Sequence, residues 1–498
     1  MDLMIDYKKG MVNHGDCSRF RKVMQRAQKG EEIKVAFLGG SITQGYLATD
    51  KELCYAALTA KWWKDTFPQA KIDYINAGIG GTTSHFGVSR VAYSVLEQQA
   101  DVIFVEFSVN DSNDEFFKET YEGLVRKILN APGKPALMLL HNVIYNTGYS
   151  AEEIHGEIGR YYNVPAVSIK ASIYDQMLTG AFGSRDVTED DLHPNNTGHR
   201  LIAETIGYFL DEIRKECVSG EEKEEKPLPA PLTMNAYEDC VRFQSADFKA
   251  HEDQYEDRKE TASLALHFDG AGQDEFSAEQ IAQGKDKERI ATAFFAAKES
   301  LKGISVSAEG FEEDRLPKRY YTDSFRGGWS AKKPGDEIKI RFTGSEFAVQ
   351  YRRTVKRPAL IAEAVVDGDT LHTVVLDANF HETWGDCLTI TPVLRHGKIV
   401  TGQTREGVTP AAYETSMEAL SLLRDEKPVA EEHEIVIRIT GVGENPAQQD
   451  GFALIQDISG GAKKEEEKDT VAANEPETFD LVSILISGPA EEAVSQDI

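Results

Sequence analysis

Short apolar runs alternate with amphipathic stretches through the N-terminal part of the chain. Runs this continuous are typical of parallel strands buried on both faces of a sheet, with helices between them. A closing helix is predicted from about Asn195, because apolar residues recur at helical spacing from Ile202 to Ile213. The pattern therefore predicts a doubly wound α/β domain over residues 1–217. Its strands are expected at residues 35–40, 72–78, 102–110, 136–143 and 164–169.

The pattern changes after a charged, proline-rich stretch at residues 218–232. Alternating prolines cannot continue a helix and favour extended chain, so this stretch is predicted to be a linker. Beyond it, short segments alternate apolar and polar residues, as half-buried antiparallel strands do. We therefore predict a β-sandwich over residues 233–460, although the polar stretch at 248–313 has no place in this scheme. The strands are expected at residues 336–342, 347–353, 362–369, 372–378, 433–441 and 452–458.

The last part of the chain, residues 461–498, begins with the charged run AKKEEEKD. Low hydrophobicity and high charge leave such a segment little apolar surface to bury, so we predict a disordered acidic tail. Residues 481–486 are apolar enough to form an isolated strand within it.

Length and composition fit two globular domains and a neutral partner. The chain has 498 residues, of which 41% are hydrophobic and 28% charged, and this allows sizeable cores. There are 83 Asp and Glu residues against 55 Lys and Arg residues, which gives a formal net charge of -28. Such a charge repels nucleic acid and anionic membrane surfaces. We therefore expect no nucleic-acid partner and no membrane partner.

The cysteines and the start of the sequence indicate the cellular compartment of the protein. The five cysteines are scattered and none forms a CxxC pair, so reduced thiols are expected rather than a disulfide framework or a structural zinc site. The start lacks the basic and then apolar plan of a secretory signal, and no stretch approaches the ~20 apolar residues of a membrane span. We expect a soluble, cytoplasmic protein.

The sharpest chemical feature is the sequence GGSIT at residues 39–43, directly after an apolar run. A small-residue turn at the C-terminal end of a buried strand places the hydroxyl of Ser41 at the sheet edge where open α/β folds bind ligands. The N–H groups at the start of the following helix can stabilise an oxyanion. The alternative is that Gly-Gly-Ser only turns the chain and that Ser41 caps the helix.

A second feature is DDLHPN at residues 190–195, just ahead of the closing helix. A serine nucleophile needs an imidazole to take its proton and a carboxylate to fix the tautomer of that imidazole. The three-residue offset lets Asp190 reach back to His193, whereas a neighbouring residue such as Asp191 generally points elsewhere. The alternative is an acidic helix cap beside a surface histidine.

Two further loops follow predicted strands, NAGIGGTT at residues 76–83 and SVND at residues 108–111. The backbone N–H of a glycine and the side-chain amide of an asparagine are suitable donors to an oxyanion. Each loop alone is compatible with ordinary turn chemistry. Because each follows a buried strand, both are expected at the sheet edge that carries Ser41.

Together these segments resemble the SGNH hydrolases, also called GDSL esterases, over residues 33–214. All four motif blocks of the family are present: GGSIT with Ser41, NAGIGGTT with Gly81, SVND with Asn110, and DDLH with Asp190 and His193. Two positions depart from the family pattern, since Gly40 replaces the aspartate of the GDSL signature and Ser108 replaces the glycine of GxND. Both lie outside the reacting atoms, so they bear on the substrate more than on catalysis.

The resemblance implies a flavodoxin-like α/β/α fold and ester hydrolysis without a metal or other cofactor. In the family mechanism Ser41 attacks the acyl carbon, His193 takes its proton and later gives it to the leaving alcohol, and Asp190 orients the ring. The oxyanion is held by the N–H groups of Ser41 and Gly81 and by the side chain of Asn110, with each donor contributing ~3 kcal/mol.

Four other polar residues of this domain have structural interpretations as well as functional ones. Glu106 lies inside an apolar strand, where a hydrogen-bonded structural carboxylate is the favoured interpretation. His199, on the closing helix, is off the face of His193 and is expected to be structural. His85 follows the glycine block and is a candidate substrate-binding residue, with an exposed loop histidine as the alternative. His141, at a strand end, has the same two interpretations.

The predicted second domain resembles the jelly-roll, carbohydrate-binding-type β-sandwich that accompanies the catalytic domain in some bacterial carbohydrate esterases. The resemblance rests on the strand pattern, on GGW at residues 327–329 and on FHETWGD at residues 380–386. It extends to two-domain O-acetylesterases that act on acetylated mannan or xylan oligosaccharides. An exposed tryptophan can stack on a sugar face, and Trp384 is the candidate for this role. A core tryptophan is the alternative, and it is favoured for Trp329.

Three functions are compatible with these features. The first is a serine esterase of the cytoplasm that removes O-acetyl groups from acetylated oligosaccharides derived from mannan or xylan. The second is a general arylesterase, lipase or thioesterase of the same fold, which would need a broad apolar acyl pocket. The third is a carbohydrate-binding protein whose α/β domain is only a scaffold. The complete motif set favours an enzyme, and a homo-oligomer is compatible with a sandwich that offers symmetric surfaces.

Overall fold

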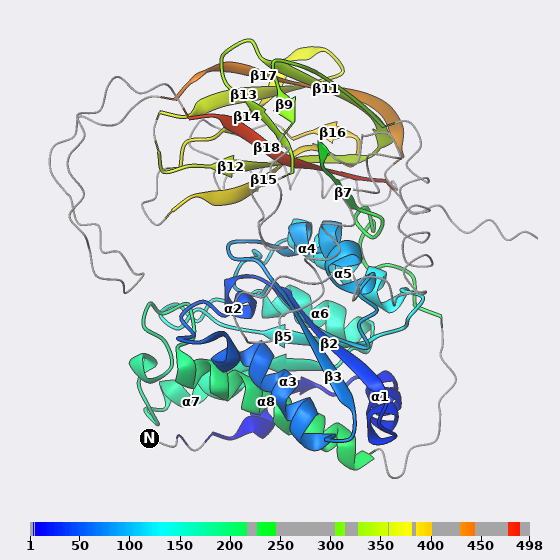
Figure 1. The fold of residues 1–498 in the computed structure, drawn as a ribbon, viewed down its shortest axis with the longest axis vertical. Coiled ribbons are helices and arrows are strands. Elements are labelled where there is room, and N and C mark those ends of the chain that lie inside the picture. The colour runs from blue at the N-terminus through cyan, green and yellow to red at the C-terminus, as the bar shows by residue number, and fades with distance from the viewer. Residues whose placement is uncertain are drawn as a thin grey trace, which may run out of the picture.

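The structure is a computed structural model, and it describes residue 3 and residues 5–216, 227–245, 304–313, 327–356, 358–380, 385–400, 429–443 and 477–488. These residues form an α/β domain and a β-sandwich that lies over one of its helical layers (Figure 1). The predicted fold class is confirmed in both parts. None of the helices in these ranges is long and apolar enough to cross a membrane.

A six-stranded sheet forms the centre of the first domain, in the order β1-β6-β5-β4-β2-β3. All neighbours pair in parallel except β1, a short edge strand that runs antiparallel to β6 and that the apolar pattern did not reveal. The order of the five parallel strands is that of flavodoxin-like folds. The strands are β1 (Met11–Asn13), β2 (Glu32–Gly39), β3 (Lys71–Gly78), β4 (Val102–Glu106), β5 (Ala136–His141) and β6 (Ala166–Ser168).

Helices cover both faces of this sheet, as the continuous apolar strands require. Along β2, Val35 and Phe37 join the core under α1, α3 and α8, whereas Ala36 and Leu38 join the core under α4, α5 and α6. Successive residues of a strand point to opposite faces, so a strand covered on both sides is apolar throughout. The helices are α1 (Ser18–Gln28), α2 (Ser41–Gln44), α3 (Tyr55–Thr66), α4 (Ser84–Val91), α5 (Glu115–Leu129), α6 (Glu152–Tyr161), α7 (Asp175–Leu178) and α8 (Asn196–Glu216).

Two antiparallel sheets form the second domain. One has the order β16-β15-β12-β18-β10-β9 with β7 paired to β18, and the other has the order β14-β13-β17-β11-β8. Apolar side chains such as Ile340, Val349 and Ile437 fill the space between them. The strands are β7 (Val241–Phe243), β8 (Ser305–Glu309), β9 (Glu312–Glu313), β10 (Trp329–Ala331), β11 (Glu337–Gly344), β12 (Glu346–Arg353), β13 (Leu360–Val366), β14 (Asp369–Asp377), β15 (Cys387–Arg395), β16 (Lys398–Ile399), β17 (Glu431–Val442) and β18 (Phe479–Ser487).

The strand allowed at residues 481–486 of the predicted tail is present as β18, but it is a central strand of the larger sheet and not an isolated one, so the prediction of a disordered tail is wrong for this segment. This strand pairs with β12, β10 and β7 in the larger sheet. Ile484 and Ile486 face the sandwich core, while Leu485 joins the core of the first domain. Both faces of β18 are therefore covered, which explains its continuous apolar sequence. The expected strand at 452–458 and the tail residues 461–476 and 489–498 lie outside the described residues.

The boundary between the domains lies further along the chain than predicted. Residues 227–240 pack against α5, where the carboxylate of Glu122 accepts hydrogen bonds from the N–H groups of Leu232 at 2.6 Å and Thr233 at 2.8 Å. The sandwich begins only with β7. Charge and proline content mark where the pattern changes, but they carry no information about which domain the following residues contact.

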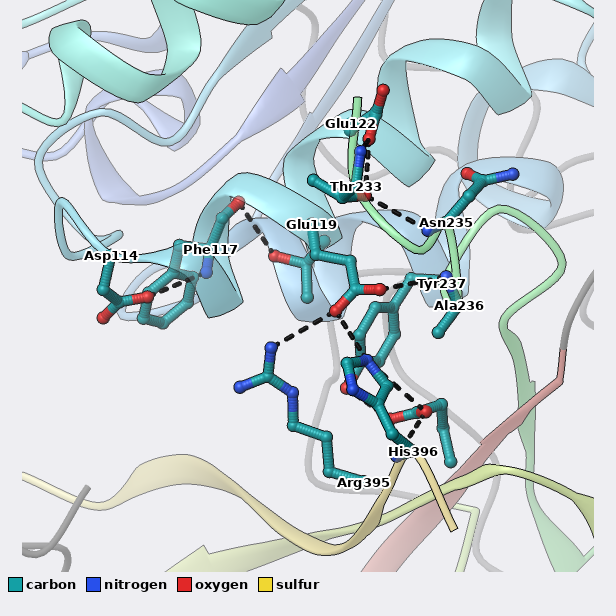
Figure 2. A network of polar contacts seen from close by, with 12 residues as sticks. Asp114, Phe117, Glu119, Glu122, Thr233, Asn235, Ala236, Tyr237, Arg395 and His396 are labelled. Atoms are coloured by element: carbon teal, nitrogen blue, oxygen red, sulfur yellow. Dashed lines mark hydrogen bonds and ion pairs between the residues drawn. The ribbon is translucent and has the colours of Figure 1, made fainter. Parts of the chain in front are cut away.

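A buried polar cluster joins the two domains at Glu119 of α5 (Figure 2). One carboxylate oxygen of Glu119 accepts hydrogen bonds from Nε2 of His396 at 2.9 Å and from Nη2 of Arg395 at 3.2 Å. The carboxylate of Glu346 accepts from the N–H of His396 and from the hydroxyl of Tyr237, each at 2.7 Å. Burial acts to raise the pKa of Glu119, but the hydrogen bond and electrostatic attraction of His396 and Arg395 hold that pKa below its usual value. The sandwich is thereby tied to one place on α5.

Candidate active site

Ser41 is the first residue of α2, and only Gly40 separates it from the end of β2. β2 lies between β3 and β4, at the point where the strand order reverses, which is where open α/β sheets bind ligands. The N–H groups of the first helical turn have no acceptor within the helix. Ser41 is partly exposed, so its hydroxyl and its N–H are both available for chemistry at this edge.

His193 and Asp190 form a hydrogen-bonded chain with Ser41. Oγ of Ser41 lies 2.9 Å from Nε2 of His193, and Nδ1 of His193 lies 2.6 Å from Oδ2 of Asp190. The other oxygen of Asp190 accepts from the N–H groups of His193 at 2.7 Å and Leu192 at 3.0 Å. A carboxylate on Nδ1 holds the ring proton there, which leaves Nε2 free to accept the proton of the Ser41 hydroxyl.

The structure also shows that Asp190 and its neighbour Asp191 have different partners. Burial acts to raise the pKa of Asp190, but hydrogen bonds from the side chain and N–H of His193 and from the N–H of Leu192 hold that pKa below its usual 3.8. Asp190 is therefore ionised at neutral pH. Asp191 adopts a positive φ of 66° and pairs instead with Nη2 of Arg185 at 2.8 Å. The carboxylate that touches the imidazole is that of Asp190.

The glycine block and Asn110 lie beside Ser41. The N–H of Gly80 donates to Oε1 of Gln44 at 2.9 Å, and a Cβ at Gly80 would lie 3.6 Å from the Cβ of Ser41. Gly81 follows with a positive φ of 67°, which favours glycine. A Cβ at Gly40 would lie 2.5 Å from Oδ1 of Asn110. The structure thus brings all the predicted oxyanion donors to one edge, and Gly40 in place of aspartate leaves room for the Asn110 side chain.

Asp111 fixes the Asn110 turn relative to the glycine block. Its Oδ1 accepts from the N–H of Ser84 at 2.9 Å, and Ser84 opens α4 directly after that block. Its Oδ2 lies 3.0 Å from Nε2 of His155, whose ring stacks on Tyr121 with centroids 3.5 Å apart. Burial raises the pKa of Asp111 to about 8 and lowers that of His155 to about 3. With these pKa values both groups are neutral at pH 7.

Ser108, the second departure from the family pattern, hydrogen-bonds a buried carboxylate. Its N–H and its hydroxyl each donate to Oε1 of Glu106 at 3.0 Å, and its hydroxyl accepts from the N–H of Asn142 at 2.7 Å. Burial raises the pKa of Glu106 to about 7. Glu106 is thus placed as the expected structural carboxylate, and a glycine at position 108 would leave it without the hydroxyl donor.

The placement of His85 differs from the prediction. Its side chain is buried between Phe116 and Tyr237, with ring centroids 5.1 Å and 5.3 Å away, and it lines a narrow gap between the two domains together with Glu346. Burial lowers its pKa to about 3. His85 is therefore neither in contact with substrate nor exposed in a loop, because the sandwich covers this end of α4. His141 is likewise fully buried.

The two tryptophan predictions have different outcomes. Trp329 lies in β10 and is buried in the sandwich core, which confirms the interpretation favoured for it. Trp384, the candidate sugar-binding residue, lies outside the described residues.

Tyr46 lies at this site although the sequence analysis did not single it out. Its ring centroid is 4.4 Å from that of His193, and 45% of the residue is exposed. His199 of α8 holds the backbone here, since its Nδ1 accepts from the N–H of Tyr55 and its Nε2 donates to the carbonyl of Tyr46, each at 3.2 Å. The only sequence signal was an aromatic residue five positions after Ser41.

A serine hydroxyl, an imidazole, an ionised carboxylate and several N–H donors at one sheet edge form the apparatus of nucleophilic acyl transfer. Within the part of the chain that the structure describes, no group of three or more His, Cys, Asp or Glu residues is placed to hold a metal ion. Fold and site together are those of an acylhydrolase on a flavodoxin-like sheet.

Comparisons with known proteins give the family. The family model described as GDSL-like Lipase/Acylhydrolase matches residues 37–201. The crystal structure of a two-domain esterase (CEX) active on acetylated mannans is 37% identical, covers 98% of this chain and 100% of its own, and has a TM-score of 0.70. The same esterase co-crystallized with mannopentaose gives the same values. The chain belongs to the GDSL, or SGNH, hydrolase family and is a carboxylic ester hydrolase.

A curated relative matches a smaller share of the chain. The Thioesterase 1/protease 1/lysophospholipase L1 of Escherichia coli (strain K12) is 27% identical over 186 residues, which are 35% of this chain and 82% of that protein. The likeness to the two-domain esterase, in contrast, includes the β-sandwich. The predicted resemblance to two-domain carbohydrate esterases is therefore confirmed.

Proposed function

We propose that the protein is a serine esterase that removes O-acetyl groups from acetylated oligosaccharides, with mannan-derived chains as the preferred substrate and xylan-derived chains as the alternative. The observation that carries the proposal is the likeness to an esterase active on acetylated mannans, which spans 98% of this chain at 37% identity and includes the sandwich. The net charge of -28 also suits a neutral glycan better than an anionic substrate. In the cytoplasm, the location expected from the sequence, the substrates would be imported oligosaccharides.

The proposed mechanism uses the hydrogen-bonded chain at the sheet edge. Oγ of Ser41 attacks the acetyl carbon while Nε2 of His193 takes the hydroxyl proton. The negative oxygen that forms is stabilised by the N–H groups of Ser41 and Gly81 and by the side-chain amide of Asn110. When this intermediate collapses, the sugar oxygen leaves with the proton from His193, and the acetyl group remains on Ser41. The charge of Asp190 stabilises the imidazolium during the transfer.

The second half of the reaction regenerates the enzyme. Nε2 of His193 takes a proton from water, and the resulting hydroxide oxygen attacks the acetyl carbon on Ser41. The same donors stabilise the second oxyanion. Acetate leaves when the bond to Oγ breaks, and His193 returns its proton to Ser41. The 2.9 Å between Oγ of Ser41 and Nε2 of His193 supports the transfers between these two groups.

The test is acetate release from acetylated manno- and xylo-oligosaccharides, with 4-nitrophenyl esters of increasing acyl length beside them. We expect release to be greatest on the mannan-derived chains and to be lost in Ser41→Ala. Ser18→Ala is a matched control, because Ser18 also opens a helix, α1, and it should keep full activity. Preference for long acyl chains, with no release from any glycan, would favour a general esterase instead. Full activity in Ser41→Ala would refute the serine mechanism.

A further inference from the structure

Tyr46 presents an aromatic surface beside the reacting groups. Its ring centroid lies 4.4 Å from the ring of His193, and the two ring planes are tilted by 58°. Nε2 of that imidazole lies 2.9 Å from Oγ of Ser41. The residue is nevertheless 45% exposed, so part of it faces solvent beside the reacting groups.

The backbone that carries this ring is held at several points. The N–H of Tyr46 donates to the carbonyl of Ser41 at 3.0 Å, and its carbonyl accepts from the buried His199 at 3.2 Å. Three residues further on, the N–H of Thr49 donates to Oδ1 of Asn196 at 3.0 Å, and Nδ2 of Asn196 donates to the hydroxyl of Thr49 at 2.7 Å. An exposed aromatic on such a backbone has little freedom left to lose when a ligand binds.

The segment also contains backbone strain. Leu47, directly after Tyr46, has a positive φ of 63°, a region that residues other than glycine enter rarely. Strained residues of this kind persist where the surrounding contacts over-determine the chain, and they cluster at binding and catalytic sites. The left-handed turn at Leu47 is therefore part of what presents Tyr46 beside His193.

We propose that Tyr46 is a substrate-binding residue whose ring stacks on a sugar ring of the bound oligosaccharide and so holds the ester over Ser41. This inference rests on the proposed function and adds to it the residue that recognises the glycan. A pyranose ring presents a face of C–H groups to an aromatic ring, and this contact needs no charge, in keeping with a neutral substrate. The contact is made by the catalytic domain itself.

The opposing interpretation is that Tyr46 only packs on His193 and keeps the imidazole in place. The two roles differ in which substrates they affect. A ring that orients the imidazole assists the hydrolysis of every ester, whereas a ring that binds sugar assists the hydrolysis only of esters carried on a sugar. An aryl acetate without a sugar ring therefore separates them.

The experiment compares Tyr46→Ala and Tyr46→Phe with the wild type on acetylated manno-oligosaccharides and on 4-nitrophenyl acetate. We expect Tyr46→Ala to raise KM on the oligosaccharides by about 3- to 10-fold, the size of one aromatic contact. Tyr46→Phe should remain close to wild type, and Tyr46→Ala should lower kcat/KM on 4-nitrophenyl acetate by a smaller factor than on the oligosaccharides. Tyr161→Ala is the control, since Tyr161 is 41% exposed but ends α6, which leads into the opposite edge of the sheet.

Two outcomes on these substrates would overturn the proposal: an equal loss on both, which would assign Tyr46 to the imidazole, and no loss on either. If the wild type released no acetate from any glycan, the proposed substrate class would be wrong. The role of Tyr46 would then be tested by measuring oligosaccharide binding. Calorimetric titration of mannopentaose into Ser41→Ala, with and without Tyr46→Ala, then supports the proposal if the second substitution weakens binding by a similar factor. Absent or equal binding overturns it.

Discussion

The carboxylate of Glu119 accepts a hydrogen bond from Nε2 of His396, a residue 277 positions further along the chain, at 2.9 Å. Glu119 lies on α5, the helix that begins four residues after Asp111. The contact thus joins the turn at the end of the sandwich strand β15 to the helix that follows the Asn110 loop (Figure 2). Removing this hydrogen bond is expected to destabilise both domains together.

Removing the buried carboxylate should destabilise the protein strongly. Breaking a buried charge pair by deleting one partner costs about 3–5 kcal/mol, because the other partner stays buried and unpaired. We therefore expect Glu119→Ala to lower the free energy of unfolding by roughly this amount in urea titration. Glu153→Ala, an exposed carboxylate on α6, should change it by less than about 0.5 kcal/mol. Equal changes in the free energy of unfolding of the two variants would show that the interdomain cluster contributes nothing to stability.

Loss of the Asp190 charge should lower activity across the whole pH range. Asp190→Asn keeps the shape of the side chain but cannot hold the proton on Nδ1 of His193, so we expect kcat to fall by about 10⁴-fold. The pKa of Asp190 is held below 3.8, so the wild-type carboxylate stays ionised from pH 5 to pH 9. The kcat/KM of the variant should therefore lie far below that of the wild type throughout that range. A defect confined to low pH would contradict this role for Asp190.

Removing the side-chain donor of Asn110 should reduce kcat more than it changes KM. The amide is proposed to bind the oxyanion, which exists only in the transition state and the intermediate, and one such donor contributes about 10²–10³ in kcat. Steady-state kinetics of Asn110→Ala on 4-nitrophenyl acetate measure this effect. Asn113→Ala, an exposed neighbour, is the control and should be close to wild type. A rise in KM at constant kcat would instead assign Asn110 to ground-state binding.

The buried Asp111 should give stability a measurable pH dependence. Burial raises its folded pKa to about 8 from the usual 3.8, so the stability that its neutral form contributes is fully present below pH 3.8 and is lost as pH rises through 8. Asp111→Asn mimics the neutral carboxyl and does not titrate. Between pH 5 and pH 8 the stability of the wild type should therefore fall relative to that of Asp111→Asn, by up to about 1.4 kcal/mol per pH unit.

Urea titrations of the two proteins at several pH values measure this difference. His155 contributes in the opposite sense, because its folded pKa is lowered to about 3 and its stabilising effect is lost as pH falls through that value. It is present in both proteins, so the difference between them isolates Asp111. A difference that stayed constant from pH 5 to pH 8 would show that Asp111 is ionised in the folded protein.

Periodicity and motifs were sufficient for much of this fold. Every strand predicted in the first domain matches an observed one, because a parallel strand covered on both faces must be apolar along its length, as β2 is. The residues that meet at the sheet edge could also be named, since each follows a strand end and parallel strands end at one edge. In this respect the sequence by itself determined the architecture of the first domain and the candidates for its chemistry.

Tertiary structure alone decided what depends on contacts between distant residues. Residues 479–487 form a central strand because β12 and the first domain cover them, although the charged residues before them predict a tail. His85 is buried because the sandwich lies on α4, and Tyr46 faces His193 because hydrogen bonds from α8 hold its loop. Local patterns record a residue's preference for apolar or polar surroundings. The partner that satisfies this preference is set only when segments hundreds of residues apart pack together, as at Glu119 and His396.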